Sequence, residues 1–306
     1  DEENRHQVNV IVDDRTLHEI YLPAFKAAVT EGGAWGIMGA YNLYHNQHNC
    51  HNNILLNKIL KHDWKFDGVV VSDWGGTHDT DEAVMNGLDM EFGTGTDGLR
   101  AGTKNAYENY YMAYPYLMGI REGKYSEKEL NDKVRRVLRL YYRTTMNRNR
   151  PNGFLCSEAH YDAARKIGDE GVVLLKNDRN VLPIDTIATH NILIVGENAI
   201  KMMTVGGGSS SLKAQREISP LQGLKDAFSS HNIKVDYERG YVGDVTGSYN
   251  GVTTGQDLND KRSSAKLIED AVAKARKADY VILFGGLNKS DYQDCEGHDR
   301  KEYGLP

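Results

Sequence analysis

An aspartate and a tryptophan directly follow an apolar run, and this pair is the first place where the sequence suggests chemistry. Residues 68–72 have the composition of a buried strand, and Asp73 and Trp74 come next. The carboxyl end of a parallel strand is where barrel enzymes place their active sites, and an indole face packs well on the apolar face of a sugar ring. An aspartate here also fits a helix cap or a turn, so position alone does not decide for catalysis.

Two weaker signals lie elsewhere in the sequence. Tyr41 ends another apolar run, residues 36–41, but a tyrosine at the end of a strand more commonly serves packing than chemistry. Composition favours a solvated acidic loop, without chemistry, for the carboxylates near the end of the sequence. These carboxylates are Asp291, Asp294, Glu296 and Asp299.

A run of three glycines and three serines at residues 206–211 suggests a phosphate loop, because glycine-rich turns expose backbone N–H donors. The run lacks both the G-x-G-x-x-G spacing of dinucleotide-binding turns and the lysine of a P-loop. A nucleotide-dependent α/β enzyme is therefore a minor alternative, which a rise in melting temperature on adding nucleotide would support.

The elements that must position these residues alternate in the first half, as βα units around a parallel sheet do. A helix is predicted from Thr16, whose spacing to Glu19 fits a capping box, and Pro23 divides that helix in two. Three or four βα steps are too few for a closed barrel, which needs eight. Strands are predicted at 36–41, 68–72 and 88–92, and helices at 53–61, 79–86, 104–122 and from Ser126 onward.

The periodicity is lost in the polar stretch 147–153, where we place a domain boundary. The alternation then resumes, and the sequence ends soon after a strand, so we expect a piece of a larger protein. Strands are predicted at 172–175, 192–195 and 280–284, and helices at 158–169, 221–228 and 263–277.

Composition excludes several classes of protein. The 306 residues are enough for two domains. A net charge of −6 without a basic block argues against nucleic acid as a partner, and no run approaches the ~20 apolar residues of a membrane span. Cys50, Cys156 and Cys295 are far apart, so they predict neither a disulfide framework nor a zinc site.

Several motifs together resemble glycoside hydrolase family 3, typified by β-glucosidases and β-xylosidases. The Ser-Asp-Trp element at 72–74 and the Leu-Leu-Lys-Asn element at 174–177 form a specific pair. The resemblance implies an α/β chain: the C-terminal half of a (β/α)8 TIM-like barrel over residues 1–146, a linker at 147–157, and the first part of an α/β sandwich domain over 158–306. Further matching stretches are residues 8–10, 14–17, 19–25, 38–42, 171–173, 285–288 and 296–300.

The resemblance also implies an activity and an active site at the junction of the two domains. The expected enzyme is a retaining, exo-acting β-glycosidase that hydrolyses terminal non-reducing β-D-glucosyl residues through a covalent glycosyl-enzyme, without metal or cofactor. By the family pattern Asp73 is the nucleophile, and Glu296, just before a Gly-x-Asp-Arg frame, is the general acid/base, with Asp294 as the alternative. Tyr41 and Trp74 would line the sugar site.

One departure limits what this chain is expected to do alone. The family's sugar-gripping residues from the early barrel belong to sequence that would precede Asp1, so we expect weak sugar binding without the remainder of the polypeptide. The expected partner is a β-linked oligosaccharide or glycoside, with neither nucleic acid nor membrane. A homo-oligomer is an option. The compartment is unknown from the sequence, and secretion or a periplasmic location is a family expectation.

Three rivals to hydrolysis of glucosides stay open at this point. A β-xylosidase would use the same residues, and a transglycosidase or phosphorylase would resolve the intermediate with something other than water. A carbohydrate-binding relative would keep the fold without turnover. Product analysis with phosphate or alcohol acceptors distinguishes the transfer reactions, and sugar binding without hydrolysis would indicate the binding protein.

Overall fold

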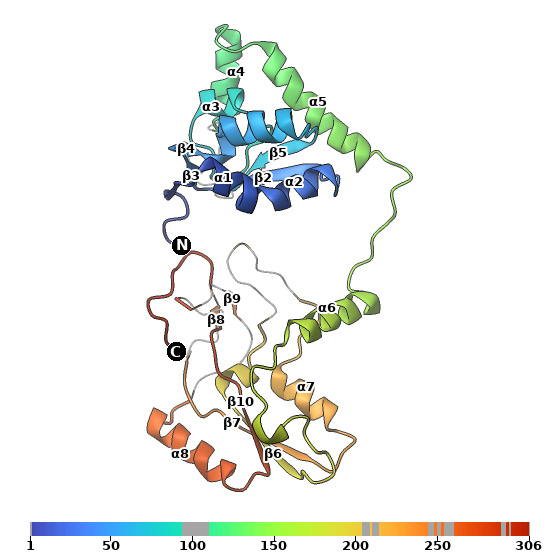
Figure 1. Ribbon diagram of the computed structural model, residues 1–306, viewed down its shortest axis with the longest axis vertical. Helices are drawn as coiled ribbons and strands as arrows, with labels where there is room; N and C mark the ends of the chain where they lie inside the picture. Colours follow the sequence, from blue (N-terminus) through green and yellow to red (C-terminus); the bar gives the residue numbers. More distant parts are fainter. Residues whose placement is uncertain are drawn as a thin grey trace. The chain divides into compact units, whose positions relative to one another are not determined.

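A computed structural model describes residues 2–93, 110–203, 209, 214–243, 248–249, 252–253, 260–288, 292–293 and 295–305. The chain divides into two compact units: an N-terminal unit, Asn4–Asn152, and a C-terminal unit, Gly153–Pro306 together with Asp1–Glu3 (Figure 1). Among the helices of the described residues, none has both the length and the apolar character needed to cross a bilayer.

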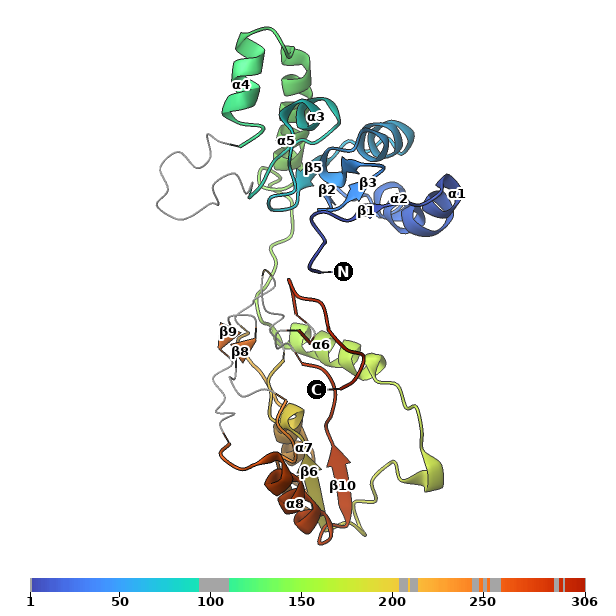
Figure 2. The same cartoon turned by 90° about the vertical axis from the view of Figure 1, so that its left-hand side faces the viewer.

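A parallel strand pair forms the centre of the N-terminal unit. β2 (Gly36–Gly39) pairs with β5 (Val69–Ser72), with Gly39 opposite Ser72. The π-helical segment η3 (Ile54–Asp63) connects the two strands, and α3 (Thr80–Met85) follows β5, so strands and helices alternate as expected. Figure 2 shows α2 (Leu22–Thr30) on one side of this strand pair and α5 (Glu127–Arg143) on the other.

The first helical stretch begins differently from the prediction. It runs through α1 (Asp14–Thr16), the π-helical η1 (Leu17–Tyr21) and α2. Its cap is Asp13, whose carboxylate accepts the Thr16 N–H at 2.9 Å, so the capping box predicted at Thr16 is wrong. Thr16 already lies inside the first turn, where the acceptor must come from the residue before the helix. Pro23 begins the second piece, as predicted.

Two predicted elements are shorter than expected. The helix predicted at 104–122 begins only at α4 (Tyr114–Arg121), because Pro115 has no N–H and suits a first turn; residues 104–109 lie outside the described part. The strand predicted at 88–92 is a single parallel bridge between Met90 and Val71. The reason is that the Asp89 carboxylate takes the Val70 N–H, at 2.8 Å, which a neighbouring strand's carbonyl would otherwise accept.

Other predicted helix boundaries in this unit are confirmed. Asp79 caps α3 by accepting the Glu82 N–H at 2.8 Å, and Gly87, at φ +102°, follows its end. Ser126 caps α5, with Glu129 bonded back to its hydroxyl.

A small sheet that the sequence pattern did not predict lies beside β2. β1 (Asn9–Val10) runs parallel to β3 (Leu43–Tyr44), which turns back into β4 (Gln47–His48) and the 3-10 helix η2 (Asn49–His51). His45 and Asn46 form the tight turn at φ 50° and 64°, which suits a two-residue hairpin. This hairpin returns the chain toward the segment that follows β2.

The C-terminal unit is built on the parallel sheet β10-β6-β7. β6 (Asn191–Val195) lies in the middle, and alternate side chains face opposite helices, as both-face burial requires. Ile192 and Ile194 pack toward α7 (Pro220–Ala227), and Leu193 and Val195 pack toward α8 (Ser264–Ala275). The edge strands are β7 (Lys234–Glu238), which was not predicted, and β10 (Tyr280–Leu283), which was.

The strand predicted at residues 172–175 is wrong. These four side chains are 62–91% exposed, and the run pairs with no described strand. Apolar composition alone does not make a strand, because the backbone groups need a neighbour. The other elements of this unit are α6 (Glu158–Gly171), the 3-10 segments η5 (Asp178–Asn180) and η6 (Glu197–Ala199), and the hairpin β8 (Ser248–Tyr249) with β9 (Val252–Thr253). The chain is therefore an α/β protein, as expected.

Candidate active site

Asp73 lies immediately after β5 and is held by main-chain bonds. Its N–H donates to the Gly39 carbonyl at 3.2 Å, which extends the β2–β5 ladder by one step, and its carbonyl accepts the Gly76 N–H at 3.0 Å. The carboxylate Oδ1 accepts the Trp74 N–H at 2.7 Å. The side chain is half-buried, so the carboxylate is fixed in direction while it stays accessible.

Tyr41 follows β2 by two residues and is also half-buried. Because β2 and β5 are parallel neighbours, with Gly39 beside Asp73, their carboxyl ends bring Tyr41 and Asp73 to the same edge of the sheet. The Tyr41 ring lies 4.1 Å from the His6 ring, and the Arg5 guanidinium lies 5.6 Å from its centroid. The N-terminal segment thus covers this tyrosine.

Trp74 is 57% exposed and stacks on Phe92, with ring centroids 5.1 Å apart and planes 19° apart. Gly93 sits against the indole at φ +57°, and a Cβ there would approach Trp74 Cδ1 to 2.3 Å. The indole is therefore a fixed aromatic surface beside Asp73. It packs on Phe92 and still leaves more than half of its surface accessible to a ligand.

The loops that follow β2 and β5 pack closely on a buried thiol. Cys50 is fully buried and donates to the Ala40 carbonyl at 3.3 Å. Burial raises the pKa of Cys50 to about 11, so it is neutral packing and not a nucleophile. A Cβ on Gly39, the last residue of β2, or on Gly76, in the loop after β5, would approach Cys50 atoms to 2.6 and 2.5 Å, so both positions need glycine.

A histidine cluster, defined here as His48, His51 and His78, lies next to this edge and was missed in the sequence. The His48 and His78 rings stack with centroids 3.8 Å apart, and the backbone N–H of His78 donates to His51 Nε2 at 3.2 Å. His48 Nδ1 lies 3.0 Å from the Tyr41 carbonyl oxygen. The available signal was the three-residue spacing of His48 and His51, together with a third histidine five residues beyond Asp73.

Electrostatics distinguish the histidines from one another. Burial lowers the pKa of His51, although Glu82, whose Oε2 lies 2.7 Å from His51 Nδ1, acts in the opposite direction. Desolvation, followed by the neighbouring His48 and His51, lowers the pKa of His78 to about 4. Desolvation and Arg5 lower the pKa of His6, against the attraction of Asp73. These three rings are thus neutral near pH 7.

Glu296 belongs to the C-terminal unit and is half-buried. Its Oε2 accepts the backbone N–H of Ser209 at 2.6 Å and the Ser209 hydroxyl at 2.7 Å. The serine of the glycine/serine run thus binds a carboxylate here, while the rest of that run, 206–208 and 210–211, lies outside the described residues.

Of the other acidic residues in this loop, Asp299 accepts the Glu2 N–H at 2.7 Å, and this bond lowers the pKa of its carboxyl group. Arg300 lies 5.7 Å from the centroid of the Tyr303 ring. The alternative acid, Asp294, and its neighbour Asp291 lie outside the described residues.

A buried charge network supports the loop that carries Glu296. Glu197, fully buried after β6, lies 2.5 Å from Lys201 and 2.6 Å from Arg239, and it also accepts the Gly243 N–H at 3.1 Å. Gln293 donates to the Gly243 carbonyl at 3.4 Å and accepts the Asn288 N–H at 3.1 Å. These bonds connect the network to the chain three residues before Glu296.

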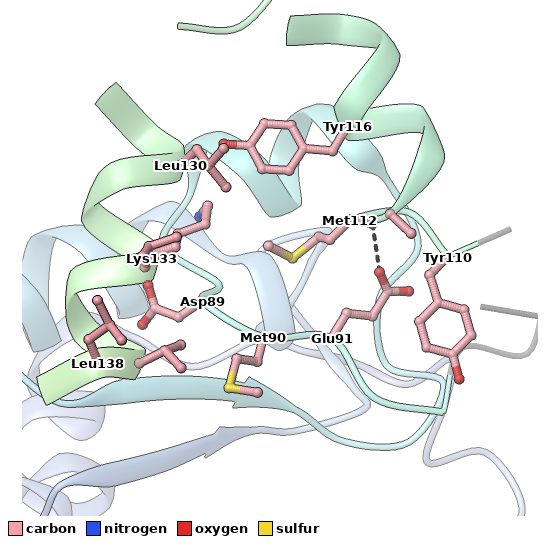
Figure 3. Close-up of a pocket in the computed structure, with 12 residues that line it drawn as sticks. Asp89, Met90, Glu91, Tyr110, Met112, Tyr116, Leu130, Lys133 and Leu138 are labelled. Carbon is pink, nitrogen blue, oxygen red and sulfur yellow. Dashed lines mark hydrogen bonds between the residues drawn. The ribbon is translucent and has the colours of Figure 1, made fainter. Parts of the chain in front are cut away.

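A pocket of about 370 Å³ lies elsewhere in the N-terminal unit, between α5 and the segments 89–91 and 110–116 (Figure 3). Glu91 lies in it and accepts the Met112 N–H at 2.7 Å, and burial raises the pKa of Glu91 to about 7. Burial also lowers the pKa of Lys133, on the opposite wall, to about 8. None of the four predicted site residues is among the described residues that line it.

The arrangement can support nucleophilic and acid/base chemistry by carboxylates. Asp73 presents a directed carboxylate next to an aromatic surface, and Glu296 is a second carboxylate with a hydroxyl partner. Each lies in a different unit.

Two family models match this chain, one in each half. The model of the Glycosyl hydrolase family 3 N terminal domain matches residues 2–140, and that of the Glycosyl hydrolase family 3 C-terminal domain matches residues 172–306. Beta-glucosidase BoGH3A of Bacteroides ovatus is 47% identical over 307 residues, which cover 99% of this chain and 40% of that protein.

Solved structures give the same result. The GH3 beta-glucosidase of Bifidobacterium adolescentis has a TM-score of 0.78 at 26% identity, covering 100% of this chain and 39% of its own. Beta-glucosidase 3B of Thermotoga neapolitana, in complex with alpha-D-glucose, has a TM-score of 0.75 at 26% identity, covering 99% of this chain and 41% of its own. The chain thus spans about two fifths of the length of these relatives.

Proposed function

The chain belongs to glycoside hydrolase family 3, and we propose that it supplies both catalytic carboxylates of a retaining, exo-acting β-glucosidase. The observation that carries the proposal is Asp73, fixed by main-chain bonds at the carboxyl end of β5, in a chain 47% identical to a beta-glucosidase along 99% of its length. The substrate is a terminal, non-reducing β-D-glucosyl residue of an oligosaccharide or glycoside.

In the first step, Asp73 attacks the anomeric carbon and forms a glycosyl ester while the bond to the leaving oxygen breaks. Oδ1 is occupied by the Trp74 N–H, and Oδ2 is the atom to which we assign the attack. The hydrogen bond to Oδ1 fixes the orientation of the carboxylate. Trp74 offers its open face to the sugar, and Tyr41 lies at the same strand edge as the nucleophile.

Glu296 gives its proton to the leaving oxygen in the first step and takes a proton from water in the second. Water then attacks the anomeric carbon, and Asp73 leaves as a carboxylate, so the product keeps the β configuration. Glu296 must therefore exist in both protonation states. Ser209 suits this because its hydroxyl donates to the carboxylate, at 2.7 Å, and can accept from the protonated acid.

We also propose the larger architecture that this function requires. Residues 1–146 form the later part of a TIM-like barrel, residues 147–157 a linker, and residues 158–306 the first part of an α/β sandwich domain. The parallel β2–β5 pair with its bridge to Met90 supports the first assignment, and the helix-flanked β10-β6-β7 sheet supports the second. The remainder of the polypeptide completes the sugar site, since relatives are more than twice as long.

The test is covalent trapping in the natural polypeptide. A 2-deoxy-2-fluoro-β-glucoside with a good leaving group should add one fluoroglucosyl group, and peptide mapping should place it on Asp73. An Asp73→Asn variant is the control and should stay unlabelled. A label on another residue, or no label on protein that hydrolyses β-glucosides, would remove Asp73 from the mechanism.

A further inference from the structure

We propose that His48 is a positioning residue for Tyr41, which rests on the proposed β-glucosidase function. Tyr41 follows β2 on a segment without helix or strand geometry, so the sheet itself does not fix it. One contact that restrains its backbone is the one to His48 Nδ1, at 3.0 Å from the Tyr41 carbonyl oxygen. The histidine cluster behind that contact determines where His48 can lie.

The hydrogen-bond partners determine the protons on two rings. A carbonyl oxygen only accepts, so His48 carries its proton on Nδ1. His51 accepts the His78 N–H on Nε2, so its own proton is on Nδ1, which faces Glu82 at 2.7 Å. The contacts thus indicate which nitrogen of each ring carries a proton, Nδ1 in both cases.

The histidine cluster is anchored to the core of the N-terminal unit. His51 is 1% exposed, and the Asn86 side chain donates to its carbonyl at 3.1 Å. Glu82 lies in the first turn of α3, which is capped by Asp79. His78 stacks on His48 with planes 22° apart, so the orientation of the His48 ring is set by a residue tied to α3 through His51.

A chain of contacts therefore connects α3 to the sheet edge that carries Tyr41 and Asp73. Asp73 is bonded to Gly39, and Tyr41 lies two residues beyond Gly39, so the offset between Tyr41 and Asp73 depends on this short segment. The His48 donor fixes its far end. A displacement of about 1 Å in a catalytic arrangement can cost about 100-fold in rate, and loss of one of several restraints on the segment should cost less, about tenfold.

Three substitutions in the natural polypeptide test this assignment. His48→Phe keeps a ring for stacking but removes the donor, and kcat/KM for an aryl β-glucoside should fall about tenfold, mostly in kcat. His48→Asn places an amide N–H near the position of Nδ1 and should recover activity to within about threefold of wild type. His62→Ala is the matched control, because His62 is 75% exposed and pairs only with the adjacent Asp63 among the described residues.

A double-mutant cycle with Tyr41→Phe separates positioning from general loss of structure. If His48 acts through Tyr41, the two substitutions should not be additive, and His48→Phe should change activity by less than about twofold in the Tyr41→Phe background. Equal losses in both backgrounds, or His48→Asn as poor as His48→Phe, would overturn the assignment.

If His48→Phe lowers the melting temperature, a substitution of the exposed His78 replaces it as the test. His78→Ala should reproduce the loss of activity and its non-additivity with Tyr41→Phe, and wild-type activity in His78→Ala would overturn the assignment. A wild-type protein without β-glycosidase activity would instead overturn the proposed function.

Discussion

The two proposed catalytic carboxylates are positioned in different ways. Asp73 directly follows a strand, and its position is defined by main-chain bonds to Gly39 and Gly76. Glu296 lies on a loop, and Ser209, which donates to its carboxylate, is 87 positions away in the sequence. A residue that continues a strand inherits its position from the sheet, whereas a loop residue depends on side chains from distant segments. Substitution of Asp73 should therefore affect the catalytic rate with little effect on stability, whereas Glu296 should also be sensitive to substitutions in the side chains that support its loop.

The largest effect is expected for Asp73→Ala. Removing the nucleophile should lower kcat on the order of 100,000-fold, because the covalent intermediate cannot form. Azide should restore part of the rate and give the inverted product. Stability should barely change, because the main-chain bonds of residue 73 do not need the carboxylate. Product stereochemistry by NMR and a melting curve are the measurements, with Asp63→Ala as an exposed control; a retained product in azide would contradict the assignment.

Glu296→Ala should have the next largest effect, and it should depend on the leaving group. General acid catalysis contributes about 100- to 10,000-fold, so glucosides with alkyl leaving groups should lose activity in that range. Aryl glucosides with acidic phenols need little proton donation and should lose less than about tenfold in the first step. Rates are measured across a series of phenols. Similar losses throughout the series would indicate Asp294 or a structural role instead.

The difference between the two carboxylates also explains which parts of the site could be predicted from the sequence. Residues 68–72 and 36–41 are apolar runs, so their strand character was predictable, although β2 ends at Gly39, two residues earlier than expected. Glu296 was assigned only through the family pattern, because nothing local separates it from other loop carboxylates. The histidine cluster was missed since its rings come from a hairpin, a 3-10 turn and a loop that only the fold brings together.

Errors in secondary structure have similar causes. β7 was missed although charged and apolar residues alternate in it, as in Lys234-Val235-Asp236, because it is only five residues long and has no continuous apolar run. The apolar run at 172–175 was wrongly predicted as a strand because composition cannot show whether a partner strand exists. Backbone pairing is a property of the whole fold, and single runs do not encode it.

A third substitution tests the support of the loop carboxylate. Glu197→Ala would leave the buried Lys201 and Arg239 without their shared anion, which costs about 3–5 kcal/mol for a broken buried pair. We expect hydrogen–deuterium exchange to rise in peptides covering residues 191–199 and 234–243, with the N-terminal unit unaffected. Glu269→Ala, which breaks an exposed pair with Lys266, is the control. Unchanged exchange around β6 would show that the network does not hold this unit together.

The smallest expected effect is a pH dependence in the N-terminal unit, outside the catalytic edge. Burial raises the pKa of Glu91 from an ordinary value of 4.5 to about 7, so between these values the folded state binds more protons than the unfolded state. The stabilisation is therefore complete below about pH 4.5 and is lost as pH rises through about 7. One pKa unit corresponds to about 1.4 kcal/mol of stability. With a reduction for the partial exposure of Glu91, the pH-dependent contribution to the free energy of unfolding is on the order of 2 kcal/mol.

The Glu91→Gln substitution isolates the contribution of Glu91 to the pH dependence of stability. The amide keeps an acceptor for the Met112 N–H and gives up the longer bond to Tyr111, 3.3 Å, so it should be slightly less stable at pH 4.5 but without the decline toward pH 7. The pH curve of the Glu91→Gln variant must be subtracted from that of the wild type, because His78 also contributes. Its pKa is lowered to about 4, so stability rises with pH below about 6.5 in both proteins. The measurement is the protection factor of residues 110–113, corrected for intrinsic exchange. Parallel curves for both proteins would mean that Glu91 does not change its protonation state over this pH range, which would contradict the prediction.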